Sequence, residues 1–280
     1  MKIIIDNAGQ TCNKFWCYIP ALIDCIKNKK KCIILYYDAQ IESFPNLFNN
    51  DYFIYPTFNK FFNKLLGIES YNWQIRKCFK NKYYNIYPFL LKKFKRTFEY
   101  TWDRRYEKIP DEFISEIKRI FIPRKDILTA IQTSFASQKT ENSIIVGVHI
   151  RRGDYKYFMD GKYFYSISEY ANICRTIQSY FKNKNVKFFI ASNEKIDSKE
   201  MKGIEYFTID QSSVVKDLYG LSYCDYIIGP PSSFSRWASF YGEVPIYFLM
   251  TSHIKESDII FRKMQCYGYY DDNEKVSFDF

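Results

Sequence analysis

Metal ligands are scarce in this sequence, which has only two histidines and no C-x-x-C pair. Its eight cysteines are scattered singly along the chain, at positions 12, 17, 25, 32, 78, 174, 224 and 266. Zinc sites need several closely spaced Cys or His ligands, so we expect no metal centre. Cys17, Ala21 and Cys25 follow helical spacing, which favours small core residues over metal ligands.

Long apolar runs are also absent, because no stretch approaches the roughly 20 apolar residues of a membrane-spanning helix. The chain opens with Met1-Lys2-Ile3-Ile4-Ile5-Asp6, where charge comes too soon for a signal peptide. An even number of cysteines without such a peptide is typical of reduced thiols in the cytosol. We therefore expect a cytoplasmic protein, either soluble or bound peripherally at the inner face of a membrane.

The composition is typical of a globular protein. Charged residues make up 26% of the 280 residues and apolar residues 47%. This length is long for one core and fits two compact halves. A polar stretch at 138–143 precedes a strongly apolar run, so we place the domain boundary there, between residues 1–140 and 141–280.

Most of the net charge of +10 comes from one segment, residues 71–108, which has eleven Lys and Arg against three Asp and Glu. Many aromatic residues lie between these charges. The segment is interpreted first as helices with an apolar inner face and a basic outer face. The alternatives are contact with an anionic membrane surface and, least favoured, binding of single-stranded nucleic acid.

Apolar runs and helical patterns alternate along the chain. For the first half we predict a strand at 2–5, a loop at 6–11, a helix to about 28 capped by Asn13, and a strand at 31–37. Residues 38–138 are interrupted by prolines and predict one helix, at 112–120. For the second half we predict strands at 144–150, 186–191, 205–209, 225–229 and 244–249, and helices at 168–183 (capped by Ser168), 214–223 and 233–241. This alternation indicates an α/β fold with a parallel doubly wound sheet.

Polar residues follow the carboxyl ends of several predicted strands. Arg151 and Arg152 follow the first strand of the second half, Asn193 the next, and Ser232-Ser233 the fourth. These ends meet at one edge, where α/β proteins bind ligands. The guanidinium fork suits phosphate oxygens, and a helix that begins at the serines would attract anions. A diphosphate site is indicated; the alternatives are a surface Arg/Asp cluster and an ordinary serine N-cap.

Two further polar residues lie near this edge. Asp217, on the helix at 214–223, is either an acceptor for a nucleoside hydroxyl or base, or a solvated carboxylate. His149 lies inside the strand at 144–150 and is either a group that orients a ligand or a satisfied core histidine. The residues alone leave both choices open.

Three segments resemble the motifs of one enzyme family. H-I-R-R-G-D-Y at 149–155 resembles the H-x-R-R-x-D-Y motif of bacterial α-1,2-fucosyltransferases, part of a larger group that includes α-1,6 and protein O-fucosyltransferases. S-S-F-S-R-W at 232–237 resembles the family's S-S-F-S-x-W segment. G-Q-T-C-N-K-F-W at 9–16 resembles its G-x-x-N-(R/Q)-(F/M) loop, with Lys14 in place of the usual arginine or glutamine.

The resemblance implies two Rossmann-like domains of glycosyltransferase B type, an acceptor half followed by a donor half. It implies inverting transfer of L-fucose from GDP-fucose to a glycan hydroxyl, α-1,2 to galactose, in surface glycan synthesis, without a metal or other cofactor. Gly9, Gln10 and Asn13 would face the sugar and the acceptor, and residues after about 250 would be candidates to cross back to the first half. A lipid-linked acceptor would give residues 71–108 a membrane to contact.

The site residues receive roles from this resemblance and from their chemistry. Arg152, with Arg151, is expected to neutralise the charge that develops on the diphosphate, helped by the backbone at Ser232-Ser233-Phe234. Inversion needs a base for the acceptor hydroxyl, and the candidates are Asp154 and Asp160. Asp154 could instead buttress the arginines. No D-x-D pair follows a predicted strand, so positive charge must come from the protein.

His149 would orient the donor or the acceptor, and Asn193 and Asp217 would bind the nucleotide. Two rival functions remain open. A glycosyltransferase that uses another nucleotide sugar would keep the arginines and the fold. A non-catalytic protein would bind a membrane or nucleic acid through residues 71–108, in a salt-sensitive way that survives Arg152→Ala.

Overall fold

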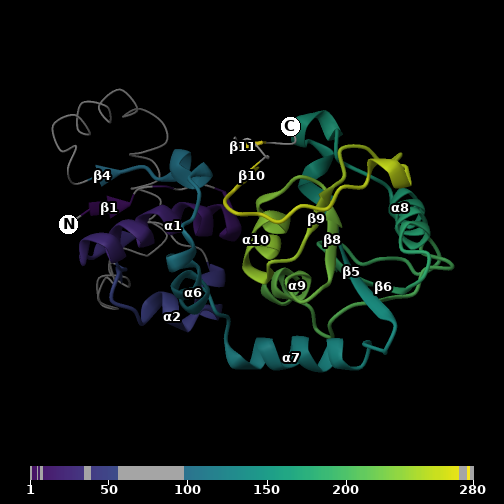
Figure 1. Ribbon diagram of the computed structural model, residues 1–280, viewed down its shortest axis with the longest axis horizontal. Helices are drawn as coiled ribbons and strands as arrows, with labels where there is room; N and C mark the ends of the chain where they lie inside the picture. The colour runs from purple at the N-terminus through teal and green to yellow at the C-terminus, as the bar shows by residue number, and fades with distance from the viewer. Residues whose placement is uncertain are drawn as a thin grey trace, which may run out of the picture. The chain divides into compact units, whose positions relative to one another are not determined.

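The computed structural model describes residues 2–4, 6, 9–34, 39–55, 98–270 and 276–277 (Figure 1). The chain divides into two compact units, residues 1–41 with 45–105 and residues 42–44 with 106–280. This division, between Arg105 and Tyr106, replaces the boundary that we predicted near residue 140. Residues 71–97 of the basic aromatic segment lie outside the described residues, so its interpretations stay predictions.

A parallel sheet and one long helix organise the first unit. Its strands are β1 (Lys2–Ile4), β2 (Cys32–Ile34), β3 (Phe53–Ile54) and β4 (Phe98–Glu99), in the order β3-β2-β1-β4. All paired strands run parallel. Helix α1 (Thr11–Asn28) joins β1 to β2, which completes the expected βαβ start. The short helical elements are η1 (Ala39–Ser43), α2 (Pro45–Phe48) and η3 (Trp102–Tyr106).

Helix α1 supplies much of the core of this unit. Cys17, Ala21 and Cys25 are all buried, as their spacing predicted. The prediction that Asn13 caps the helix was wrong, since Gln10 is the N-cap residue and Asn13 already lies within the helix. Gln10 is the last residue with an extended backbone, so the helix begins at Thr11.

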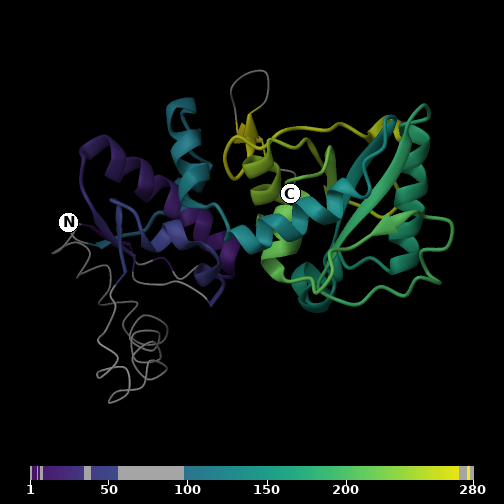
Figure 2. The same ribbon diagram turned by 90° about the horizontal axis from the view of Figure 1, so that it is seen from below.

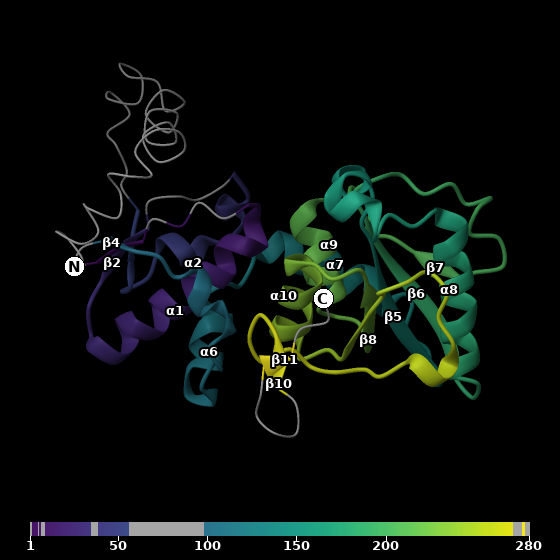
Figure 3. The ribbon, with the colours of Figure 1, turned by 90° about the horizontal axis from the view of Figure 1, so that it is seen from above.

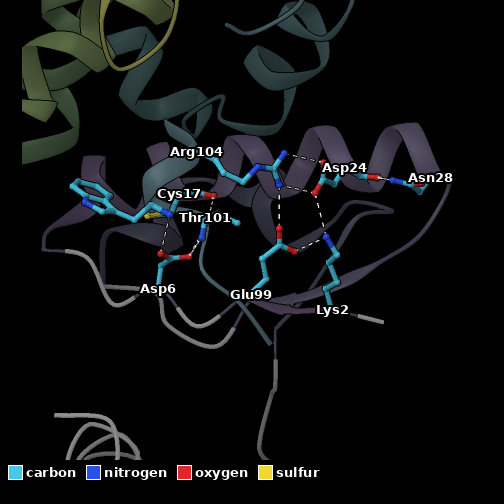
Figure 4. A network of polar contacts seen from close by, with 9 residues as sticks. Lys2, Asp6, Cys17, Asp24, Asn28, Glu99, Thr101 and Arg104 are labelled. Atoms are coloured by element: carbon cyan, nitrogen blue, oxygen red, sulfur yellow. Dashed lines mark hydrogen bonds and ion pairs between the residues drawn. The ribbon is translucent and has the colours of Figure 1, made fainter. Parts of the chain in front are cut away.

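A network of polar contacts holds the end of this unit against its beginning (Figure 4). The buried Asp6 carboxylate accepts hydrogen bonds from the backbone N–H groups of Thr101 and Trp102, at 2.8 and 3.0 Å. Arg104 donates to Asp24 on α1 at 2.7 Å. Burial raises the pKa of Asp6, while the hydrogen bonds from Thr101 and Trp102 act in the opposite direction. The segment that leaves the unit is thereby fastened to β1 and α1.

The second unit contains the predicted parallel doubly wound sheet, with the strand order β7-β6-β5-β8-β9. Figure 3 shows β7, β6, β5 and β8 side by side in this order. Central β5 pairs with β6 along its whole length and with β8 on its other side. The bounds are β5 (Ser143–Ile150), β6 (Asn185–Ser192), β7 (Tyr206–Phe207), β8 (Tyr226–Gly229) and β9 (Ile246–Phe248). A short antiparallel pair, β10 (Tyr269–Tyr270) and β11 (Val276–Ser277), follows in the same unit.

Helices cover both faces of this sheet (Figures 2 and 3). Val148 and Ile150 of β5 face a core shared with α8 (Ile167–Tyr180). Gly147 faces α9 (Val214–Leu221), because a Cβ added there would lie 2.7 Å from Leu221. Side chains alternate along a strand, so His149 shares the face of Gly147, which also bears α10 (Ser233–Gly242).

Two helices precede the sheet, α6 (Asp111–Ile120) and α7 (Lys125–Ala136). We did not predict α7. Its Phe135 ring lies 5.2 Å from the rings of both Phe189 and Phe207. These contacts join α7 to the second sheet, in the unit that begins at Tyr106. The remaining helical turns are η4 (Gly153–Lys156), η5 (Phe158–Gly161) and η6 (Glu256–Asp258).

Candidate active site

The carboxyl ends of β5 and β8 mark the switch point of the second sheet, because the chain runs outward from β5 to β6 on one side and to β8 on the other. Gly229 ends β8 beside His149, and a Cβ added to it would lie only 2.8 Å from the His149 Cβ. Glycine is therefore needed for the two strand ends to approach. Helix α10 begins at Ser233, which brings its N-terminus to the same edge.

His149 is buried and bonded to the first turn of α10. Only 4% of its surface is exposed, and its Nδ1 lies 2.7 Å from the Ser235 hydroxyl oxygen. The Phe234 ring packs against the imidazole, with centroids 4.8 Å apart. Burial lowers the pKa of His149 to about 3, with a smaller effect of the Arg151 charge, so the imidazole is neutral. His149 is thus a satisfied buried histidine whose partner belongs to the S-S-F-S-R-W segment.

Arg151 lies on the His149 side of the strand end. Its Nη2 donates to Asp154 Oδ2 at 2.8 Å, and its guanidinium carbon lies 5.8 Å from the centre of the Tyr155 ring. The Tyr155 hydroxyl donates to the Pro231 carbonyl at 2.9 Å, just before the serine segment. Arg151 is therefore connected to the segment that leads from β8 to α10.

Arg152 turns toward the end of β6. Its Nε donates to Glu194 at 2.9 Å and its Nη1 to the Tyr165 carbonyl at 2.9 Å. Its backbone N–H donates to Asn193 Oδ1 at 3.0 Å. The next residue, Gly153, has a φ of +48°, and a Cβ there would collide with Asn193 Nδ2 at 2.6 Å. Asn193 and Glu194 thus brace the turn that carries the arginines.

Ser232 caps helix α10. Its Oγ accepts from the Ser235 N–H at 3.1 Å and lies 3.4 Å from His149 Nδ1. The alternative of a serine N-cap is therefore correct for Ser232, while Ser233 and Phe234 form the first turn. An N-cap does not exclude anion binding, because other N–H groups of the first turn still point outward.

Asp217 is buried on α9 rather than solvated. The Ser212 hydroxyl donates to its carboxylate, and the Ser192 N–H at the end of β6 contributes a further hydrogen bond. Burial raises the pKa of Asp217 to about 6, and both hydrogen bonds oppose the rise. The structure therefore places Asp217 at the same sheet edge as Asn193.

The two candidate bases occupy the loop after β5. Asp154 pairs with Arg151, but its side chain remains 58% exposed. Asp160 is also exposed and has a φ of +56°, as part of a left-handed run from Met159 to Gly161. The structure brings Asp154 to the arginine pair, whereas Asp160 makes no contact with either arginine in the part of the chain described.

The three site residues predicted in the first half lie together in the first unit. Gly9 has a φ of +36°, and a Cβ there would lie 2.2 Å from Asn13 Nδ2. Lys14 Nζ donates to the Gly9 carbonyl at 3.2 Å. Gln10 stands between the loop and the helix as its N-cap residue. Asn13 therefore packs against the loop backbone, and glycine is needed for that approach.

Sequence reasoning missed Ser235 and Glu194. Ser235 stands three residues after Ser232, the usual distance between an N-cap and the N–H that it accepts, so its place in the first turn was detectable. Glu194 directly follows Asn193 but carries no motif. Within the described ranges, no group of three or more His, Cys, Asp and Glu side chains could hold a metal ion. None of the helices described is long and apolar enough to cross a membrane.

Comparison with known proteins agrees with this arrangement. The model of glycosyl transferase family 11 matches residues 49–258. No curated protein matches the chain. The fucosyltransferase NodZ from Bradyrhizobium is 17% identical, with 88% of this chain and 94% of NodZ covered and a TM-score of 0.54. POFUT1, solved in complex with GDP-fucose, is 11% identical, with coverages of 86% and 93% and a TM-score of 0.54.

These similar structures confirm the predicted glycosyltransferase B fold class. The family model spans most of the chain, from the first unit to the end of the doubly wound sheet. The protein therefore belongs to glycosyl transferase family 11, the fucosyltransferase family that its motifs resemble.

Proposed function

We propose that this enzyme transfers L-fucose from GDP-fucose to a glycan hydroxyl with inversion, forming an α-1,2 linkage to galactose in surface glycan synthesis. The observation that carries the proposal is the meeting of Arg151, His149 and the N-terminus of α10 at one switch point. NodZ has been crystallised with GDP and soaked with GDP-fucose, and POFUT1 has been solved with GDP-fucose. Membership of the family supports the same donor here.

The leaving group sets the main electrostatic demand. When the bond between fucose C1 and the β-phosphate oxygen breaks, the oxygen keeps the electron pair and GDP departs with added negative charge. Arg151 and the N–H groups at the start of α10 supply positive potential at this edge. We give Arg151 the leading role and make Arg152 a brace, because Arg152 is engaged by Glu194 and the Tyr165 carbonyl.

Asp217 is assigned to the nucleoside. It is a buried carboxyl at the end of β6. Its carboxylate oxygens can accept further hydrogen bonds, from the N–H groups of a base or from a ribose hydroxyl. Asn193 is better suited to bracing the loop than to binding the nucleotide, since its Oδ1 accepts from the Arg152 N–H.

The acceptor hydroxyl must lose its proton as its oxygen bonds to fucose C1. The ion pair between Asp154 and Arg151, at 2.8 Å, supports a buttressing role for Asp154. Asp160, exposed in the same loop, is then the base candidate that remains in the second unit. Gly9, Gln10 and Asn13 are assigned to the acceptor side by their family motif.

Transfer is proposed to need no metal or other cofactor, since the arginine and the helix N-terminus provide the required positive charge. The enzyme is proposed to act in the cytoplasm, on a glycan that is carried on a lipid. Residues 71–108 are proposed to contact the membrane peripherally; most of this segment lies outside the described residues.

Product analysis tests the linkage and the stereochemistry together. The enzyme is incubated with GDP-fucose and a galactose-terminated acceptor, and the product is analysed by NMR. Because the fucosyl bond of GDP-fucose is β, inversion predicts an α-fucosyl group, and we expect it on O2 of galactose. A β product would contradict inversion, and fucose on another oxygen would contradict the α-1,2 assignment.

A further inference from the structure

The hydrogen bond between Ser235 and His149 defines a role that the family motif does not assign. We propose that Ser235 is a positioning residue whose hydroxyl donates to His149 Nδ1 and holds the imidazole as the Nε2–H tautomer. Nε2–H is then a fixed hydrogen-bond donor to an oxygen of the bound nucleoside diphosphate. This ligand class rests on the proposed function, whereas the tautomer is a property of the free protein.

The pair is isolated from solvent. Ser235 is fully buried, His149 is 4% exposed, and 2.7 Å separates Ser235 Oγ from Nδ1. The Phe234 ring covers one side of the imidazole at an interplanar angle of 30°. Ser235 lies 86 residues after His149, so the contact joins the end of β5 to the first turn of α10. The ring is therefore held by packing and by a short hydrogen bond to Ser235, with Ser232 Oγ farther away at 3.4 Å.

The direction of that hydrogen bond follows from its surroundings. Nδ1 faces the first turn of α10, where the helix dipole is positive and disfavours a second proton donor. The Arg151 charge acts in the same sense. An unprotonated Nδ1 that accepts from the Ser235 hydroxyl suits both the helix dipole and the Arg151 charge. The single N–H proton of the neutral ring must then sit on Nε2.

The neighbouring serine completes the network. Ser232 Oγ accepts from the Ser235 N–H at 3.1 Å and lies 3.2 Å from Ser235 Oγ. The Ser232 hydroxyl can therefore donate to Ser235 Oγ, which leaves the single hydrogen of Ser235 for Nδ1. Both serine hydroxyl hydrogens then have an acceptor, as buried polar groups require.

Histidine NMR on the full chain without ligand tests the tautomer. The chain has only two histidines, so ¹⁵N labelling of histidine gives two imidazole spin systems, and His253→Gln assigns them. We expect His149 to show a pyridine-type Nδ1 and a pyrrole-type Nε2, unchanged from pH 5 to 8. A wild-type spectrum with the proton on Nδ1, or with both nitrogens protonated, would overturn the proposal without reference to any variant.

Two substitutions on α10 then separate positioning from stability. Ser235→Ala removes the nearer hydroxyl donor to Nδ1 and leaves Ser232 Oγ at 3.4 Å. Ser239→Ala removes an equally buried hydroxyl that instead donates to the Val244 carbonyl. We expect Ser235→Ala to mix the two tautomers and to weaken GDP binding in calorimetry about five- to tenfold, the usual effect of one hydrogen bond. Ser239→Ala should change neither, and Ser235→Thr, which keeps the hydroxyl, should retain the wild-type tautomer.

The His149 tautomer and the GDP affinity are measured independently, so the role of Ser235 can be tested apart from the proposed function. If the wild-type protein shows the Nε2–H tautomer but binds no GDP, the positioning of His149 stands and the proposed donor fails. If GDP binds and Ser235→Ala changes neither the tautomer nor the affinity, Ser235 has only a structural role and the inference is wrong.

Discussion

Arg151 and Arg152 are adjacent in the chain but have different surroundings. Arg151 shares its side of β5 with His149 and the serine segment. Arg152 is bound by Glu194 and by the Tyr165 carbonyl, and its guanidinium carbon lies 4.6 Å from the Phe164 ring centre. From the sequence we predicted that Arg152 would have the leading role at the diphosphate, because a motif does not show which way a guanidinium group points.

Alanine at each arginine separates catalysis from bracing. Arg151→Ala should lower kcat for fucose transfer about 10²-fold or more, with little change in urea stability, because it removes an oriented charge donor. Arg152→Ala should cost about 1 kcal/mol of unfolding free energy, since it leaves Glu194 and the Tyr165 carbonyl without this donor. Steady-state kinetics and urea titration measure both. The reverse pattern would return the leading role to Arg152.

Asp217 gives the fold a specific pH dependence. Its pKa is raised from 3.8 to about 6 by burial, so the folded chain holds this proton more tightly than the unfolded chain. The contribution of protonated Asp217 to the free energy of unfolding is fully present below the pKa of this carboxyl in the unfolded chain. It is lost as the pH rises through about 6, and the pKa shift corresponds to a loss of about 3 kcal/mol. Asp217→Asn cannot ionise and should lose less stability between pH 4 and 7 in urea titrations. Equal losses in variant and wild type would contradict burial as the cause.

Among the elements, the strands of the second sheet and the starts of α9 and α10 were predictable, whereas the caps of α1 and α8 and the short strands β3 and β4 were not. The β-branched run at 144–150 predicted a buried strand, and the structure places β5 there. Two of the prolines that suggested an irregular region instead stand at helix beginnings. Pro45 is the first residue of α2, and Pro110 is the N-cap of α6. Helix α7 was missed because only Ile127, Ile131 and Phe135 mark its buried face.

The start of α8 offers a matched pair of serines. Ser166, not the predicted Ser168, caps the helix: its Oγ accepts from the Glu169 N–H, and Glu169 accepts from the Ser166 N–H. The S-x-x-E spacing of this capping box was the signal that we overlooked. Ser166→Ala should lower the unfolding free energy by about 1 kcal/mol, and Ser168→Ala by clearly less. Equal losses in urea titrations would show that the box contributes nothing.

At the scale of the whole molecule, topology made the candidate site predictable and packing set its details. Parallel strands end at one edge, so Arg151, Asn193 and Ser232 had to converge once the strands were placed. The boundary could not be predicted, because it depends on aromatic contacts between α7 and a sheet that begins later in the chain. Side-chain partners such as Ser235 and Glu194 likewise depend on contacts that no spacing fixes.

The most direct test of the central claim is GDP and UDP release from a panel of nucleotide sugars in EDTA, with wild type beside Arg151→Ala. We predict release from GDP-fucose in the wild type, stimulated by a galactoside acceptor, and a loss of about 10²-fold or more in the variant. Release from another donor, or a requirement for added metal ions, would contradict the donor or the metal independence. No release and no nucleotide binding by calorimetry would contradict GDP-fucose-dependent transfer itself.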